Sequence, residues 1–166
     1  MPLSPVQTQQ PMTLATDPAF FRLLADSYKR LLSSPPPFLE GSDGDCPQWL
    51  YARGPACVLA HSTDDDPRFI YANRAAQMLF EYSWDEIVGM PSRLSAEAPD
   101  RAERQRLLNA VNRNGFATGY SGVRISKSGR RFQIEDGTLW QLRDANGTLH
   151  GVAATFSHWL HLEGVG

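Results

Sequence analysis

The amino-acid sequence predicts an α+β fold built on an antiparallel sheet. Three strand-length runs rich in β-branched and aromatic residues close the chain, at 116–126, 130–142 and 148–159. Ser128-Gly129 joins the first pair and Asn146-Gly147 the second, and both dipeptides are typical of tight hairpins. Strands joined by hairpins exclude a doubly wound parallel sheet, which needs helical crossovers.

The first 55 residues are predicted to form an extension of this sheet domain. Residues 1–16 are rich in Pro, Gln and Thr, a composition typical of disorder. Residues 17–34 predict a helix, because Asp17-Pro18 is a helix start signal and Pro35 to Pro37 cannot continue a helix. Residues 35–55 are expected to be a linker. The apolar side chains at helical spacing are a candidate partner surface: Phe21, Leu24, Tyr28, Leu31 and Leu32. The alternative is that this helix folds back over the sheet of its own domain.

The next elements follow in close succession. The segments 56–61 and 68–72 predict two antiparallel strands around the turn that contains Asp64, Asp65 and Asp66. Short helices are expected at 73–80 and 83–88, and a longer one at 99–114 with Leu107, Leu108 and Val111 facing inward and Gly115 as its C-terminal cap.

The middle strand of the final three carries an interruption. Phe132, Ile134, Trp140 and Leu142 share parity, and Asp136-Gly137 lies between the two pairs. This dipeptide predicts a bulge or a close backbone approach.

Composition and charge set limits on the function classes. The formal net charge is −2, which gives no argument for nucleic acid or for an anionic membrane. There are two cysteines, too few for a disulfide framework, and no run approaches the ~20 apolar residues of a membrane span. The start of the chain lacks a secretory pattern, so a cytoplasmic location is expected. Basic residues cluster late in the chain, as a solvated face or as a strip for an acidic partner: Arg101, Arg104, Arg124, Lys127, Arg130 and Arg131.

Several longer strings support a resemblance to a known family. DDDPRFIYANRAAQMLF, PSRLSAE, DRAERQRLL, GYSGVRISKSGRRFQIED and HGVAATF resemble the MEKHLA family of PAS-like domains, and DSYKRLL resembles the N-terminal part of its bacterial members. The resemblance covers most of the chain beyond Asp17. It implies a PAS-like five-stranded antiparallel sheet with short helices over one face, at 56–160, followed by a tail at 161–166. It also implies a role in sensing or in regulated association. The helix at 17–34 would be the surface for a homodimer or for a signalling partner.

The sequence offers no cofactor that can be named. A flavin photosensor of the LOV type needs a reactive cysteine after Val88, and GMPSRLSAE has none. The helix 99–114 contains no histidine, the usual axial ligand of a haem PAS domain. His61, His150 and His158 are the alternative iron ligands, against the ordinary interpretation of each as a satisfied or exposed histidine. No CxxC pair and no EF-hand spacing occurs, so no metal site is expected. No GxSxG elbow indicates a catalytic nucleophile.

The resemblance implies a cavity between the short helices and the sheet. The predicted lining combines aromatic and aliphatic side chains with three polar ones: Tyr71, Asn73, Phe80, Trp84, Met90, Arg93, Leu94, Leu108, Val111, Tyr120, Glu135 and Trp140. The alternative is that these side chains simply fill the core. Arg93 is expected either to receive a carboxylate or phosphate or to pair with Glu97.

Three function classes remain open. The first is a non-enzymatic sensory or regulatory module that binds a small ligand or a protein partner and acts in trans through association. The second is an interaction scaffold with a filled core, in which the basic strip meets an acidic partner. The third is a small enzyme that uses Asp136 or His150 within the cavity.

Overall fold

The computed structural model describes residues 14–162, apart from the side chains of residues 98–100. Its centre is an antiparallel sheet in which β2 (Phe69–Ala72), β1 (Cys57–His61), β5 (Leu149–Phe156), β4 (Arg131–Arg143) and β3 (Phe116–Ile125) lie side by side in that order. This arrangement confirms the predicted fold class. A sixth strand, β6 (His158–His161), was not predicted and pairs with residues 132–135 of β4.

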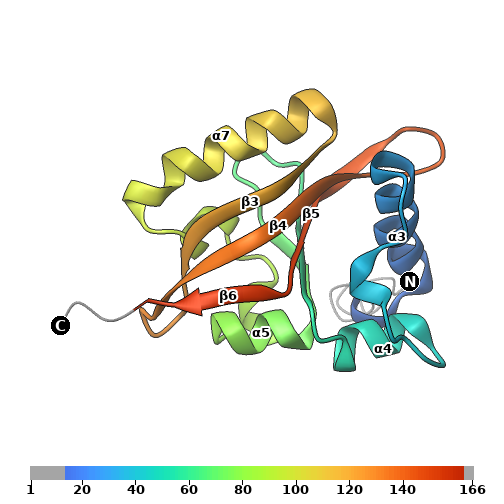
Figure 1. The fold of residues 1–166 in the computed structure, drawn as a ribbon, viewed down its shortest axis with the longest axis horizontal. Coiled ribbons are helices and arrows are strands. Elements are labelled where there is room, and N and C mark those ends of the chain that lie inside the picture. Colours follow the sequence, from blue (N-terminus) through green and yellow to red (C-terminus); the bar gives the residue numbers. More distant parts are fainter. Residues whose placement is uncertain (1–13, 163–166) are drawn as a thin grey trace, which may run out of the picture.

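One face of the sheet carries the short helices and the long one. α5 (Arg74–Phe80) begins at Asn73, whose side chain accepts a bond from the Ala76 amide, and α6 (Trp84–Ile87) begins with a Ser83–Glu86 capping box. The 3-10 turn η2 (Ser92–Ser95) leads to α7 (Ala98–Asn114), which ends at Gly115 with φ 90°. Figure 1 shows α7 lying along the sheet beside β3.

The N-terminal helix α3 (Pro18–Leu32) covers the opposite face (Figure 1). The indole Nε1–H of Trp140 donates to the Leu24 carbonyl at 3.2 Å, and the Ser27 hydroxyl donates to the Arg143 carbonyl at 2.9 Å. Leu24 and Tyr28 are buried in this contact, so the apolar stripe that was a candidate partner surface is used within the chain. Phe21, Leu31 and Leu32 remain half-buried against the same cluster.

The segment expected to be a linker, 35–55, is folded into the same layer. It contains the 3-10 turn η1 (Pro37–Leu39) and the helix α4 (Cys46–Arg53). Phe38 stacks on Trp140 with ring centroids 5.6 Å apart, and Trp49 and Leu50 are buried. Burial of these three side chains explains why a proline-rich segment holds a fixed path. Of the segment expected to be disordered, 1–16, Leu14 and Ala15 also pack here, and 1–13 lies outside the described residues. His161, expected in the C-terminal tail, belongs to β6.

The Asp136-Gly137 step in β4 divides the strand into two halves with different partners. Asp136 has φ 55°, the left-handed region that few non-glycine residues adopt, and β3 has register shifts on both sides of Tyr120, which pairs with Gly137. Phe132 and Ile134 therefore belong to the apolar cluster under α5, whereas Trp140 belongs to the cluster under α3. The predicted interruption is present. Because of it, residues of equal parity before and after Asp136-Gly137 lie on opposite faces of the sheet.

Candidate ligand-binding site

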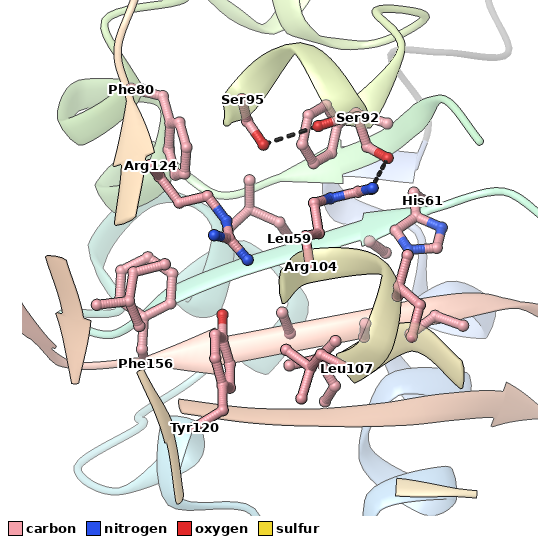
Figure 2. Close-up of a pocket in the computed structure, with 18 residues that line it drawn as sticks. Leu59, His61, Phe80, Ser92, Ser95, Arg104, Leu107, Tyr120, Arg124 and Phe156 are labelled. Atoms are coloured by element: carbon pink, nitrogen blue, oxygen red, sulfur yellow. Dashed lines mark hydrogen bonds between the residues drawn. The ribbon is translucent and has the colours of Figure 1, made fainter. Parts of the chain in front are cut away.

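A cavity of about 60 Å³ lies between α7, η2 and the sheet. By this measure one water molecule needs roughly 10–15 Å³, so the space holds roughly four to six water-sized positions. Figure 2 shows its lining, in which polar groups from four elements converge among apolar side chains. The larger apolar members are Leu59, Phe69, Phe80, Leu107, Leu108, Ile134, Leu139, Val152 and Phe156.

Arg104, from the middle of α7, lines the cavity, and Figure 2 shows its guanidinium reaching toward Ser92. It is 9% exposed, and its Nη2 donates to the Ser92 hydroxyl oxygen. The Ser95 hydroxyl donates in turn to the Ser92 carbonyl at 2.7 Å, so η2 holds this serine in place. Burial lowers the pKa of Arg104 from 12.5 to about 10, and the nearby charge of Arg124 adds to the effect.

Arg124, from β3, supplies a second buried guanidinium. It is 6% exposed, its Nη1 donates to the Val123 carbonyl at 2.8 Å, and the same nitrogen lies 3.5 Å from Oε1 of Glu103. Glu103 lies one position before Arg104 on α7, so the helix places one carboxylate and one guanidinium beside Arg124. The Arg124 side chain is shielded from water, whereas the Glu103 side chain is 35% exposed, so this ion pair is partly screened.

Tyr120, from β3, also lines the cavity, and in Figure 2 its hydroxyl points toward the guanidinium of Arg124. Burial raises its pKa to about 12, so the phenol is protonated and can donate a hydrogen bond. Its ring lies directly over Gly137: a Cβ at that position would be 2.3 Å from the Tyr120 Cε1. The glycine of the β4 interruption is thus the residue that allows Tyr120 to stand in the cavity wall.

His61, at the end of β1, lies where the cavity meets a surface groove of about 250 Å³. Its Nδ1 lies 3.0 Å from the Ser62 carbonyl, which can only accept, so Nδ1 carries the proton and Nε2 is buried without a hydrogen-bond partner among the described residues. Burial lowers the pKa of His61 below 6.5, so the ring is neutral at neutral pH. Cavity and groove share His61, Arg104, Leu108 and Val152.

Three of the twelve predicted lining residues line this cavity: Phe80, Leu108 and Tyr120. Val111 and Met90 pack in apolar clusters on the same face but do not line the cavity. Leu94 is 41% exposed and Glu135 lies opposite His158 in the β4–β6 pair.

Tyr71, Trp84 and Trp140 belong to the other apolar cluster, with α3 and α4. Asn73 is fully buried and uses its amide to tie the chain together. Its oxygen accepts from the Val58 amide at 3.1 Å, and its nitrogen donates to the Ala56 carbonyl at 2.8 Å. These contacts give the Asn73 side chain a structural role, since its polar atoms are already occupied.

Arg93 points away from the cavity and pairs with Asp66, whose carboxylate oxygen is 3.1 Å from Arg93 Nε. The expected Arg93–Glu97 pair does not form, because Glu97 lies 3.7 Å from Arg131 instead. The predicted Arg93–Glu97 pair is therefore wrong, and the Arg93 guanidinium pairs with the carboxylate of Asp66.

The predicted basic strip is also divided. Arg104 and Arg124 are inside the cavity, Lys127 pairs with Glu86, and Arg101 donates to the Ala96 carbonyl. Arg130 is exposed. Sequence reasoning placed the two cavity arginines on the surface because charged side chains are rarely buried.

Asp136 and His150, the candidates for an enzymatic role, lie outside the cavity. Asp136 is exposed at the β4 interruption, and His150 is exposed with Nε2 2.8 Å from Asp144 at the β4–β5 hairpin. Over residues 14–162, no group of three His, Cys, Asp or Glu side chains is placed to hold a metal ion. Within the same range, no helix has both the length and the apolar character needed to cross a membrane.

The comparisons with known proteins agree with this fold. The family model of the MEKHLA domain matches residues 18–161, a range that includes α3 and α4. The chain belongs to the MEKHLA domain family. The comparison with curated proteins gave no match.

Solved structures of PAS and LOV domains share the fold at low identity. A PAS domain from Colwellia psychrerythraea matches with a TM-score of 0.53 and 18% identity, over 61% of this chain and 83% of that one. An RNA-binding Light-Oxygen-Voltage receptor matches with a TM-score of 0.54 and 19% identity, over 66% of this chain and 30% of that one. A blue-light activated histidine kinase of Erythrobacter litoralis matches with a TM-score of 0.54 and 19% identity, over 65% of this chain and 33% of that one. Identities of this size show a shared fold.

The lining does not fit a flavin or a haem. Pockets for drug-sized ligands and cofactors measure roughly 300–1,000 Å³, well above the 60 Å³ found here. No lining residue is a cysteine, and burial raises the pKa of the nearby Cys57 thiol to about 12, so it is not a thiolate at neutral pH. The cavity residues fit a much smaller ligand.

Proposed function

We propose that this MEKHLA domain is a non-enzymatic sensory or regulatory module that binds a small molecule in the cavity under α7. The observation that carries the proposal is the lining itself, in which apolar side chains surround a few converging polar groups. A filled core needs no buried guanidinium at its centre, and two are present, Arg104 and Arg124.

Such a module would transmit ligand binding to its surface through α7 and α3. A Cβ on Gly115, the cap of α7, would lie 2.9 Å from Leu31 Cδ2 of α3, so the end of the cavity helix touches the last turn of the N-terminal helix. A ligand that shifts α7 would therefore shift the region around Leu31 and change association, with a second copy or with a signalling partner, in the cytoplasm. Two unpaired cysteines, Cys46 and Cys57, are in keeping with that compartment.

A catalytic role for Asp136 or His150 has no support from the geometry, because neither side chain lines the cavity. The hypothesis of an interaction scaffold whose basic strip meets an acidic partner is weakened, because two of the six residues of that strip are buried.

Native mass spectrometry of the full chain, purified without added ligand, together with its absorption spectrum, tests the proposal. We expect a bound mass of a small organic molecule, or binding of small fragments in a subsequent screen, with a flat visible spectrum. A bare mass together with no binding from a fragment screen would favour the interaction scaffold.

A further inference from the structure

The two arginines leave the cavity with a surplus positive charge. Glu103 is the carboxylate within ion-pair distance of Arg124, and none of the described carboxylates lies within that distance of Arg104. Asp66 is near Arg104 but is bound by Arg93, and the His61 ring is neutral at neutral pH. Two guanidinium groups and one carboxylate amount to one uncompensated positive charge.

A buried charge of this kind is costly unless an opposite charge accompanies it. Arg104 has used one donor, on Ser92, and a guanidinium has five. Tyr120 offers a protonated hydroxyl on the same side of the cavity (Figure 2). Hydrogen-bond donors that lack an acceptor favour the binding of an anion. The two oxygens of a planar carboxylate match the paired N–H groups of a guanidinium.

The rest of the lining limits the size and polarity of that anion. Leu107, Leu108, Leu139 and Val152 present aliphatic surface to the same space, which suits a short apolar tail. One surplus charge matches a monoanion. A phosphate or a dicarboxylate would bring a second negative charge without a partner.

The groove beside His61 adds to this selectivity. Asp64 and Asp65 lie on its rim, at the turn between β1 and β2, and would repel a dianion more strongly than a monoanion. Because the groove and the cavity share Arg104, a ligand entering there meets the guanidinium on its way in.

We propose that the cavity binds a small monocarboxylate with a short apolar tail, its carboxylate held by Arg104 and Tyr120 with support from Arg124, and its tail against Leu108 and Val152. This assignment rests on the proposed function and specifies the ligand of the same site.

The test is a titration of the full chain with butyrate, its neutral amide butyramide, and inorganic phosphate, followed by calorimetry and by the thermal midpoint. We expect butyrate to bind and to raise the midpoint, and each of the other two to bind about 10- to 100-fold more weakly, the range for losing a charge-assisted hydrogen bond. R104M should lose butyrate binding by a similar factor. R130M, which removes an exposed arginine outside the cavity, should leave it unchanged.

The outcomes separate the two proposals. Equal binding of butyrate and butyramide would overturn the carboxylate assignment and leave a neutral-ligand module. Tighter binding of phosphate would overturn it in favour of a different anion. If R104M still binds butyrate and R130M does not, the binding site is on the surface and the proposal is wrong. If none of the three probes binds, the carboxylate assignment fails, and a neutral-fragment screen by native mass spectrometry then decides whether the proposed function also fails.

Discussion

The buried guanidinium of Arg104 leads to a prediction about the ligand-free protein. Replacing Arg104 by methionine keeps most of the aliphatic stem and removes the charge. The lowering of its pKa from 12.5 to about 10 corresponds to about 3 kcal/mol by which the folded state disfavours the charged form. Loss of the bond to Ser92 costs about 1 kcal/mol in return. We therefore expect R104M to be more stable than the parent by about 1–2 kcal/mol.

For a chain of 166 residues each kcal/mol shifts the thermal midpoint by about 2–4 °C, so the expected rise is about 2–8 °C. Urea denaturation followed by tryptophan fluorescence, on protein shown by mass spectrometry to carry no ligand, gives the free energy of unfolding. R106M is the matched control, because Arg106 is exposed on the same helix and should change stability by less than about 0.5 kcal/mol. An R104M protein less stable than the parent by 1 kcal/mol or more would show that Arg104 has a compensating partner, and the argument for an anionic ligand would fall.

Three further predictions concern the cavity wall, the α3 layer and pH. G137A places a methyl group against the Tyr120 ring and should cost about 1–3 kcal/mol in urea denaturation; in a Y120A background, where the ring is gone, the same substitution should cost less than about 0.5 kcal/mol, and a neutral G137A in the parent contradicts the close approach. W140A removes a fully buried indole and should cost about 3–5 kcal/mol by the same assay, and a loss under 1 kcal/mol would mean that α3 is not anchored there. Burial lowers the His61 pKa, so below pH 6.5 the unfolded chain binds a proton that the folded chain does not, and stability should decline as the pH falls through that range. H61Q should flatten this decline, and H158Q, at an exposed histidine, should not. Equal pH profiles for the parent and H61Q would refute the argument.

The sequence was sufficient for the fold class because the turn signals and helix caps are local. Asn73, Ser83 and Gly115 each act within a few residues of their own position, and the structure places each at the predicted helix boundary. These effects need no knowledge of the tertiary arrangement.

Trp140 lies outside the cavity because strand parity does not survive a bulge. Trp140 shares parity with Phe132 and Ile134, so an uninterrupted strand would place all three on one face. The Asp136-Gly137 step adds a residue to the strand and turns Trp140 to the other side.

The two cavity arginines were missed for a different reason. Arg104 and Arg124 occur in a basic stretch of sequence, where a solvated face is the ordinary interpretation. Helical spacing does place Arg104 one turn from Leu107 and Leu108, which were predicted to face inward. That spacing was the available signal, and only the packing of α7 on the sheet shows how deep the guanidinium lies.

The central claim is that the space under α7 is a ligand site, and mapping of methyl chemical shifts during a butyrate titration tests it most directly. We predict that the methyl signals of Leu107, Leu108 and Val152 shift first and saturate together, while those of Leu24 and Leu50, in the α3 and α4 layer, stay in place. Shifts confined to exposed residues such as Met78 and Leu160, with the cavity methyls unchanged, would contradict the claim.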